Sequence, residues 1–160
     1  MPDTLTQAGL GTLAAAVRRR LKHVVAQRIE PYGLTIQQLW VMLVLLEQGP
    51  SSLHPLAQQV WMDDPTASRV VKVLVERGLL RTQPDPHHGR RILITLAPQG
   101  QALAGELQAL ASEIKRGIVA GLSSEQQAQL RMGLMVMIHN LDGMQGELDA
   151  RSAGRGAAAS

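Results

Sequence analysis

The sequence predicts a mainly α-helical protein with one small β-hairpin. The 160 residues contain no Phe, one Tyr and two Trp, so Leu, Val, Ile, Met and Ala must provide most of the packing. This composition favours helices, because pleated sheets prefer aromatic and β-branched residues. Apolar residues recur at spacings of three and four along most of the chain and approach alternation only within residues 79–96. The length indicates one domain or a small two-part unit, and 45% hydrophobic residues suffice for a buried core.

The charge distribution permits a polyanionic partner. The net charge is only +3, but residues 1–30 carry five basic against two acidic side chains and residues 51–100 carry six against four. The absence of Cys excludes disulfides, thiolate metal sites and thiol redox chemistry. No apolar run approaches the roughly 18 residues of a membrane span, and the N-terminus lacks the order of a signal peptide. We therefore expect a soluble cytoplasmic protein with no membrane partner.

The first predicted helix spans residues 5–30 and ends at Pro31 and Gly33. Its apolar positions recur at helical spacing and are Leu10, Leu13, Val17, Leu21 and Val24. A basic run, Arg18 to Arg20 with Lys22, covers the other sides. A solvated helix face is the simplest interpretation of this run. The alternative is that some of these residues contact phosphates or line a pocket.

The second predicted helix spans residues 35–47, and residues 49–52 end it. Thr35 is a suitable N-cap and Gln38 stands at the capping-box spacing. The inward positions are Leu39, Met42, Leu43 and Leu46. Trp40 lies beside this stripe and is expected in the core, with a pocket wall as the alternative.

The third predicted helix is short and runs from near His54 to Trp61, because Pro55 is tolerated only in a first turn. Its inward positions are Leu56, Ala57 and Val60.

A fourth helix is predicted over residues 64–77. Asp64 is the expected N-cap, Pro65 the first helical residue and Gly78 the left-handed residue that ends the helix. An apolar stripe is formed by Val70, Val71 and Leu74, while the other faces carry Thr66, Ser68, Arg69, Lys72 and Val73. The short connections between the last three helices predict a helix-turn-helix. Small polar and basic residues on the outer side of its last helix suit the major groove of DNA.

A β-hairpin is predicted directly after this helix. Residues 79–83 and 91–96 have the composition of strands, and two prolines and a glycine make residues 84–90 an exposed tip. A hairpin in this position is a wing, which we assign to residues 84–91. The adjacent His87 and His88 are expected to be solvated wing residues rather than metal ligands.

Two long helices are predicted to follow, over residues 98–121 and from a capping box at Ser123 and Gln126. Their apolar positions are Leu103, Leu107, Leu110, Ile114 and Ile118 in the first, and Leu130, Leu134, Ile138, Leu141 and Leu148 in the second. Together with the first helix they need a covering partner, and a second copy of the chain is the economical one. The predicted organisation is therefore residues 1–31 and 98–149 for dimerisation, 34–97 for the winged helix-turn-helix, and 150–160 as a disordered tail.

These features together resemble the multiple-antibiotic-resistance regulator (MarR) family of bacterial winged-helix transcription factors. The resemblance covers nearly the whole chain in element order and is most specific from residue 34 to residue 100. The motifs that carry it are Leu34-Thr35 followed by Gln38, Leu56-Ala57, the run from Thr66 to Leu74, and Gly78-Leu79-Leu80-Arg81. The family's wing pattern, Asp-x-x-Asp-x-Arg, is altered here to Asp85, His88 and Arg90, so the carboxylate that normally braces the arginine is missing. The Leu-Thr-x-x-Gly that follows the wing in the family is altered to Leu96-Ala97-Pro98-Gln99-Gly100.

The resemblance implies a homodimeric regulator that binds a palindromic double-stranded operator. Thr66, Ser68, Arg69 and Lys72 are the expected major-groove residues, and Arg90 with Arg91 would enter the minor groove. The family implies repression, released by a small aromatic or anionic ligand. Candidate residues for that ligand's pocket are Arg18, Arg19, His23 and Trp40.

Two other classes of function are weighed against this one. An enzyme is disfavoured because the spacing of the five His and thirteen acidic residues matches neither a catalytic triad nor a metal site, and no glycine-rich phosphate loop is present. A metal-responsive regulator of the same fold would have to use His, Asp or Glu ligands. His23, His54 and His139 are too scattered in sequence to indicate such a site. No cofactor and no metal are therefore expected.

Overall fold

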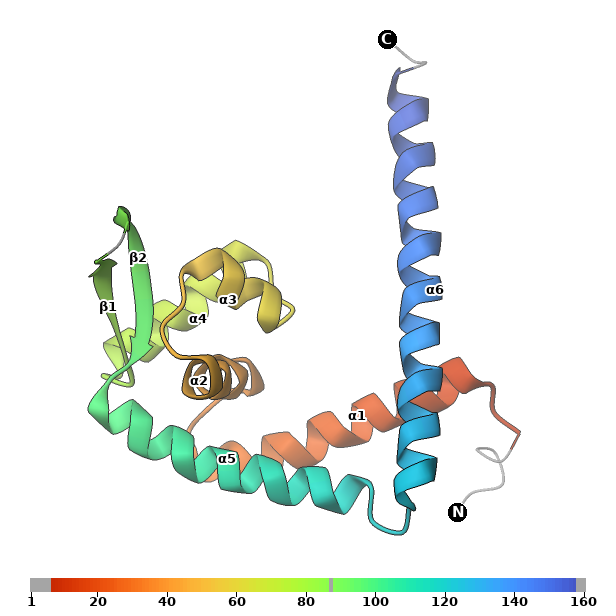
Figure 1. Ribbon diagram of the computed structural model, residues 1–160, viewed down its shortest axis with the longest axis horizontal. Helices are drawn as coiled ribbons and strands as arrows, with labels where there is room; N and C mark the ends of the chain where they lie inside the picture. Colours follow the sequence, from red (N-terminus) through yellow and green to blue (C-terminus); the bar gives the residue numbers. More distant parts are fainter. Residues whose placement is uncertain (1–6, 87, 158–160) are drawn as a thin grey trace. The chain divides into compact units, whose positions relative to one another are not determined.

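The computed structural model describes residues 7–86 and 88–157 and is mainly helical, with one two-stranded antiparallel sheet (Figure 1). The elements in chain order are α1 (Leu10–Ile29), the 3-10 turn η2 (Glu30–Tyr32), α2 (Ile36–Gln48), α3 (Leu53–Gln59), α4 (Asp64–Glu76), β1 (Leu80–Asp85), β2 (His88–Leu96), α5 (Pro98–Ile118) and α6 (Ser124–Ala157). The fold class predicted from the sequence, helices with a hairpin wing, is confirmed. The chain divides into two compact units, one up to Ile114 and the other from Lys115 onwards.

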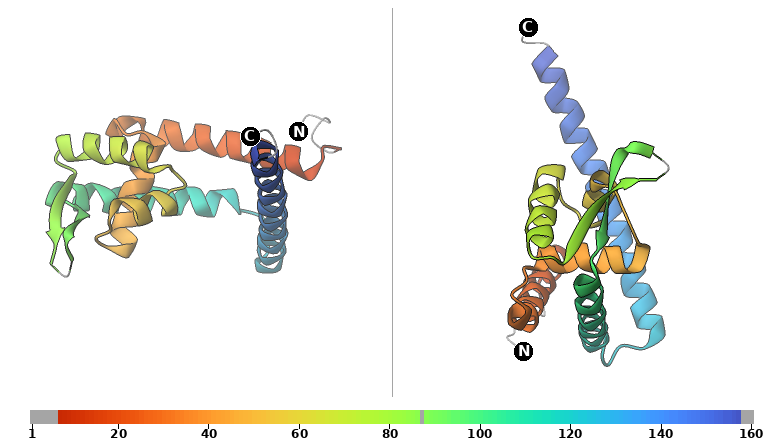
Figure 2. Two further views of the ribbon diagram at one scale, coloured as in Figure 1. Left: turned by 90° about the horizontal axis from the view of Figure 1, so that it is seen from above. Right: turned by 90° about the vertical axis from the view of Figure 1, so that its left-hand side faces the viewer.

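The core of the first unit is built around α2. Val41 and Met42 are fully buried, as are Leu56 of α3, Leu74 of α4 and Leu107 of α5. The helices α1 and α5 run side by side next to α2 (Figures 1 and 2). The single core therefore joins the helix-turn-helix to both flanking helices.

Most predicted helix ends have the expected caps. The Thr35 side chain accepts from the Gln38 backbone N–H at 3.2 Å, and the Gln38 side chain accepts from the Thr35 N–H at 2.8 Å. The same reciprocal pair joins Ser123 and Gln126, at 3.2 and 2.8 Å. Gly78 has the predicted left-handed conformation, with a φ of 70°.

Several predicted boundaries are wrong, including the ends of the third helix, at Gln59, and of the fifth, at Ile118. The N-cap of α4 is Asp63 rather than Asp64, and Asp64 and Pro65 are its first two helical residues. The first helix begins at Leu10 rather than at residue 5, after a turn at residue 7 and an extended Gly9. The last helix continues to Ala157, where the sequence predicted a disordered tail from residue 150, and residues 158–160 lie outside the described part.

The wing hairpin is longer than predicted, because its strands extend to Asp85 and from His88. Leu80 pairs with Leu96 and Asp85 with His88, and the register shifts between Pro84 and Asp85. The hairpin is tied to the loop after α2 by two backbone hydrogen bonds between Ser51 and Ile94, of 3.1 and 2.8 Å. The wing base is therefore fixed to the helix-turn-helix.

Gly100 allows the first turn of α5 to pack directly on the chain that enters the wing. A Cβ at this position would lie 1.9 Å from the Leu79 carbonyl oxygen, which accepts a hydrogen bond from the Ala97 N–H at 3.0 Å. Only glycine fits this approach without a backbone shift.

The two tryptophans are both exposed. Trp40, expected in the core, is 43% exposed and lies beside the buried face of α2. Trp61 is 91% exposed and has a φ of 55°, the only positive φ of a non-glycine residue in the described chain. Trp61 follows the C-cap of α3, where its N–H donates to the Gln58 oxygen at 3.2 Å and the Met62 N–H donates to the Ala57 oxygen at 2.9 Å. These two hydrogen bonds close the end of α3. They place Trp61 in a left-handed conformation that a glycine usually adopts at the end of a helix.

The second unit consists of the end of α5, a turn through Gly121 with a φ of 86°, and α6. No side chain described in α6 is buried. Its exposed large apolar residues are Leu130, Met132, Leu134, Met135, Val136, Ile138, Leu141, Met144 and Leu148.

Candidate nucleic-acid interface

The helix α4 has one buried and one exposed face. Its buried residues are Ala67, Val70, Val71 and Leu74. The predicted DNA-contacting residues Ser68, Arg69 and Lys72 are exposed together on the opposite side, whereas Thr66 is half-buried at its edge. Pro65 and Glu76, which the sequence did not single out, share the exposed side at helical spacing. The exposed side therefore combines small, polar and basic groups.

The two basic side chains of this face have only weak partners within the chain. Arg69 donates to the Pro65 carbonyl at 3.3 Å and to the Thr66 hydroxyl at 3.2 Å, both near the upper end of hydrogen-bond distances. The Lys72 Nζ lies 3.9 Å from the Glu76 carboxylate, an exposed pair of the kind that contributes little. Both cations can therefore exchange these contacts for phosphate or base oxygens at small cost.

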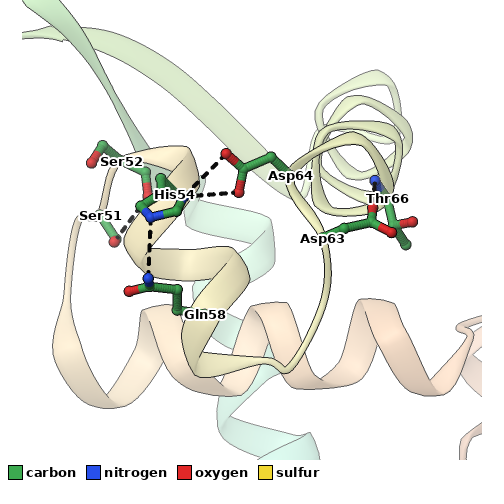
Figure 3. A network of polar contacts seen from close by, with 7 residues as sticks. All are labelled: Ser51, Ser52, His54, Gln58, Asp63, Asp64 and Thr66. Carbon is green, nitrogen blue, oxygen red and sulfur yellow. Dashed lines mark hydrogen bonds and ion pairs between the residues drawn. The ribbon is translucent and has the colours of Figure 1, made fainter. Parts of the chain in front are cut away.

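The first turn of α4 is acidic and well capped. The Asp63 carboxylate accepts from the Thr66 N–H at 2.6 Å, and the Thr66 contacts hold the pKa of Asp63 below its usual value. Asp64 contacts His54 of α3, an arrangement that the sequence did not predict (Figure 3).

Arg77 anchors the other end of α4. Its guanidinium donates to the carbonyl oxygens of Gly33 at 2.8 Å and Tyr32 at 3.1 Å, at the junction between α1 and α2. The observed contact ties the C-terminal end of α4 to the segment that precedes α2.

The wing supplies further positive charge. Arg91 is exposed on β2. The side chains of His88 and Arg90 lie outside the described part of the structure, so the minor-groove role of Arg90 stays a prediction.

The four candidate pocket residues are all exposed and lie on two adjacent helices. Arg18, Arg19 and His23 are on α1 and Trp40 is on α2. No hydrogen bond or ion pair of the described residues joins them. A separate ion pair, with Arg28 Nη2 2.6 Å from the Glu113 carboxylate, links α1 to α5.

The described residues form neither a metal site nor a membrane-spanning helix. Within residues 7–86 and 88–157, no three His, Asp or Glu side chains are placed to share a metal ion. No single described helix is long and apolar enough to cross a membrane. Residues 10–32 and 36–48 meet those criteria only as a bent pair, and the second of these helices forms part of the core of the first unit.

Comparison with known proteins agrees with the geometry. A model of the MarR family matches residues 32–91, the segment from η2 into β2. A probable transcriptional regulator from Pseudomonas aeruginosa is 36% identical, with a TM-score of 0.69 over 83% of this chain and 98% of that chain. BpsR from Bordetella bronchiseptica, solved in a study of how 6-hydroxynicotinic acid regulates its DNA binding, is 29% identical, with a TM-score of 0.71 over 81% of this chain and 92% of that chain.

The fold also matches a protein solved on DNA. MepR of S. aureus in its DNA complex is 21% identical, with a TM-score of 0.77 over 84% of this chain and 99% of that chain. The Pseudomonas aeruginosa protein is a probable transcriptional regulator, and the BpsR and MepR structures concern DNA binding. The chain, which has their winged helix-turn-helix, belongs to the MarR family of DNA-binding transcriptional regulators.

Proposed function

We propose that this protein is a homodimeric repressor that binds a palindromic operator and releases it when a small ligand binds. The observation that carries the DNA-binding part is the exposed side of α4, where Ser68, Arg69 and Lys72 lie together with no strong partner. Placed in the major groove, Arg69 and Lys72 would contact bases and phosphates, with Ser68 and the edge residue Thr66 as smaller partners.

The wing would supply the second contact. Arg90 would enter the minor groove and Arg91, exposed on the same strand, would contact the flanking backbone or groove. A narrow, A·T-rich minor groove attracts arginine by its more negative potential. The replacement of the bracing Asp by His88 leaves Asp85 as the wing's acidic residue.

The dimer part rests on α6 and α1. Nine large apolar side chains of α6 are at least 42% exposed, and Leu10 and Val17 of α1 are more than half exposed. Surfaces of this kind are rarely left open to water in a stable monomer. We assign residues 1–31 and 98–149 to dimerisation by a two-fold helical interface, and residues 34–97 to DNA binding.

The ligand part rests on exposed side chains of two adjacent helices. The guanidinium groups of Arg18 and Arg19, the imidazole of His23 and the half-exposed indole of Trp40 would suit an aromatic acid. BpsR, whose DNA binding is regulated by 6-hydroxynicotinic acid, gives a first compound to test.

The test is binding of the purified protein to its own upstream intergenic DNA, with footprinting at two salt concentrations. We expect one protected palindrome with half-sites about one helical turn apart and a steep salt dependence. Adding 6-hydroxynicotinic acid or related aromatic acids should weaken protection if the ligand class is right. Binding with no sequence preference at low salt would overturn the operator proposal, and protection that no aromatic acid affects would overturn the ligand class alone.

A further inference from the structure

A polar cluster links α3 to the beginning of α4 (Figure 3). The Nδ1 of His54 lies 3.1 Å from each carboxylate oxygen of Asp64, the first residue of α4. The Nε2 of His54 lies 3.1 Å from the Nε2 of Gln58, one turn later on α3. The cluster therefore connects the two helices of the helix-turn-helix through one imidazole.

The cluster is open to solvent and close to the residues proposed to contact DNA. The side chains of His54 and Asp64 are 66% and 48% exposed. Asp64 precedes Ser68 by four residues, so the two are neighbours along the surface of α4. The charge of this cluster would therefore interact with a DNA duplex bound to the exposed side of α4.

That end of α4 is negatively charged. The lowered pKa of Asp63 keeps its carboxylate ionised near neutral pH, and Asp64 adds a second acidic side chain. Two carboxylates at the start of a helix that must approach DNA repel the phosphates and therefore weaken binding. A positive charge on His54 would offset one of them.

The hydrogen bonds of His54 can accommodate both of its charge states. A neutral imidazole that donates from Nδ1 to Asp64 can accept from the Gln58 amide at Nε2, which fits the nitrogen-to-nitrogen contact. A protonated imidazole donates from both nitrogens, so Gln58 would turn its amide oxygen towards it. Neither state requires the backbone to move.

We propose that His54 is a positioning residue that makes DNA binding proton-linked. Protonated His54 neutralises Asp64 at the start of α4, so the affinity for DNA rises when His54 gains a proton. The inference rests on the proposed operator binding. It adds a second way to regulate DNA affinity, through protonation of a residue that contacts α4 rather than through ligand binding.

Few other charged groups can take over this role. Among the elements packed on α3, α4 contributes Asp64 and the nearby Asp63, and Glu47 is the only ionisable residue of α2. On β2, the exposed Arg91 is the cation whose side chain is described. The only ion pair described for His54 is with Asp64.

The experiment compares full-length variants on operator DNA at about pH 6 and about pH 8 and constant ionic strength, with affinity measured by fluorescence anisotropy. His54→Gln keeps a hydrogen-bond donor for Asp64 but cannot become charged. Asp64→Asn removes the carboxylate and leaves the Asp63 cap intact. Thermal unfolding of each variant is measured to check that the variant retains the fold.

The expected result is wild-type binding about two- to fivefold tighter at the lower pH, as an exposed ion pair allows. His54→Gln should lose the part of the pH response that depends on His54. Any response from His87 and His88 in the wing would remain in that variant. Asp64→Asn should bind more tightly than the wild type at about pH 8.

Two results would overturn the proposal while leaving the operator binding intact. One is a His54→Gln variant that keeps the whole wild-type pH response, and the other is an Asp64→Asn variant that binds no more tightly than the wild type at the higher pH. If the wild type binds no operator at either pH, the proposed function fails and this inference fails with it.

Discussion

The helices α4 and α6 use their apolar residues in opposite ways. In α4, the 13 residues include Ala67, Val70, Val71 and Leu74 buried on one face, and the exposed side is mostly polar, with Val73 41% exposed. In α6, which is 34 residues long, nine large apolar side chains are between 42% and 65% exposed. The buried face of α4 is therefore covered by its own chain, whereas α6 exposes more apolar surface than this chain covers.

The difference separates two sources of stability. Packing of α4 is intramolecular, so it should not depend on protein concentration. If a second copy covers α6, stability of that region follows mass action and rises with concentration. The predictions below test each side of this contrast, beginning with the largest expected effect.

The largest effect is expected from removing apolar bulk from α6. The double substitution Leu134→Asn and Leu141→Asn changes two exposed residues seven positions apart, which lie on one side of the helix. We expect the dimer to dissociate and operator affinity to fall by about 100-fold, because each subunit then binds only one half-site. Sedimentation and DNA titration measure the two effects. Arg131→Gln on the same helix is the control, and an unchanged dimer mass in the double variant would contradict the assignment.

The next effect is expected in the winged unit. In Gly100→Ala, the new Cβ would lie 1.9 Å from the Leu79 carbonyl oxygen, so α5 and the wing entry must separate. We expect the free energy of unfolding to fall by about 2 to 4 kcal/mol at any protein concentration.

The matched control for that substitution is Gly105→Ala on the same helix. Nothing lies within 4 Å of a Cβ built at Gly105, so this change should stabilise the protein by up to about 1 kcal/mol. Denaturant unfolding measures both variants. Equal stabilities of the two would show that the close approach of Gly100 does not constrain the fold.

A smaller effect is expected for Lys72→Ala. The lysine loses only a 3.9 Å contact with Glu76, so stability should hardly change. If Lys72 contacts a phosphate, the slope of log affinity against log salt should decrease by about one unit. DNA titrations at several salt concentrations measure the slope, and an unchanged slope would remove Lys72 from the phosphate contacts.

The smallest effect is expected at the cap of α4. Asp63→Ala removes the acceptor of the Thr66 N–H and should lower the melting temperature by about 2 to 4 °C, whereas Asp63→Asn keeps a capping oxygen and should lower it less. Because the folded state lowers the pKa of Asp63 below 3.8, its charge stabilises the fold above about pH 4 and loses that effect as the pH falls further. The wild type and Asp63→Ala should therefore converge in strong acid. A constant difference across the acid range would mean that the carboxylate charge contributes nothing.

Local signals in the sequence predicted the elements well but left some ends uncertain. The capping boxes at Thr35 and Ser123 and the turn at Gly78 were found because each depends on a few adjacent residues. The cap of α4 was misplaced by one residue, since Asp63 and Asp64 are equally good caps and proline fits either of the first two helical positions. Tertiary contacts decided between them, because Asp64 is held by His54.

Features that depend on distant residues were not predictable in this way. Trp40 is apolar and lies next to a buried stripe, yet the helix turns it partly towards solvent. The contacts of Arg77 with Tyr32 and Gly33 join residues more than forty positions apart, and no local pattern indicates them. By contrast, helical periodicity alone predicts which residues lie on the exposed side of α4, so these could be identified from the sequence.

The exposure of Trp61 provides a spectroscopic means of following the protein without a label. Its indole is 91% exposed and stands two residues before the Asp63 cap, whereas the only other tryptophan, Trp40, is on α2 among the candidate pocket residues. A Trp61→Phe variant would emit only from Trp40, and a Trp40→Phe variant only from Trp61. Iodide quenching of the two variants would then distinguish shielding at the start of α4 from shielding at α2. The two fluorophores could report operator docking and ligand binding as separate optical signals.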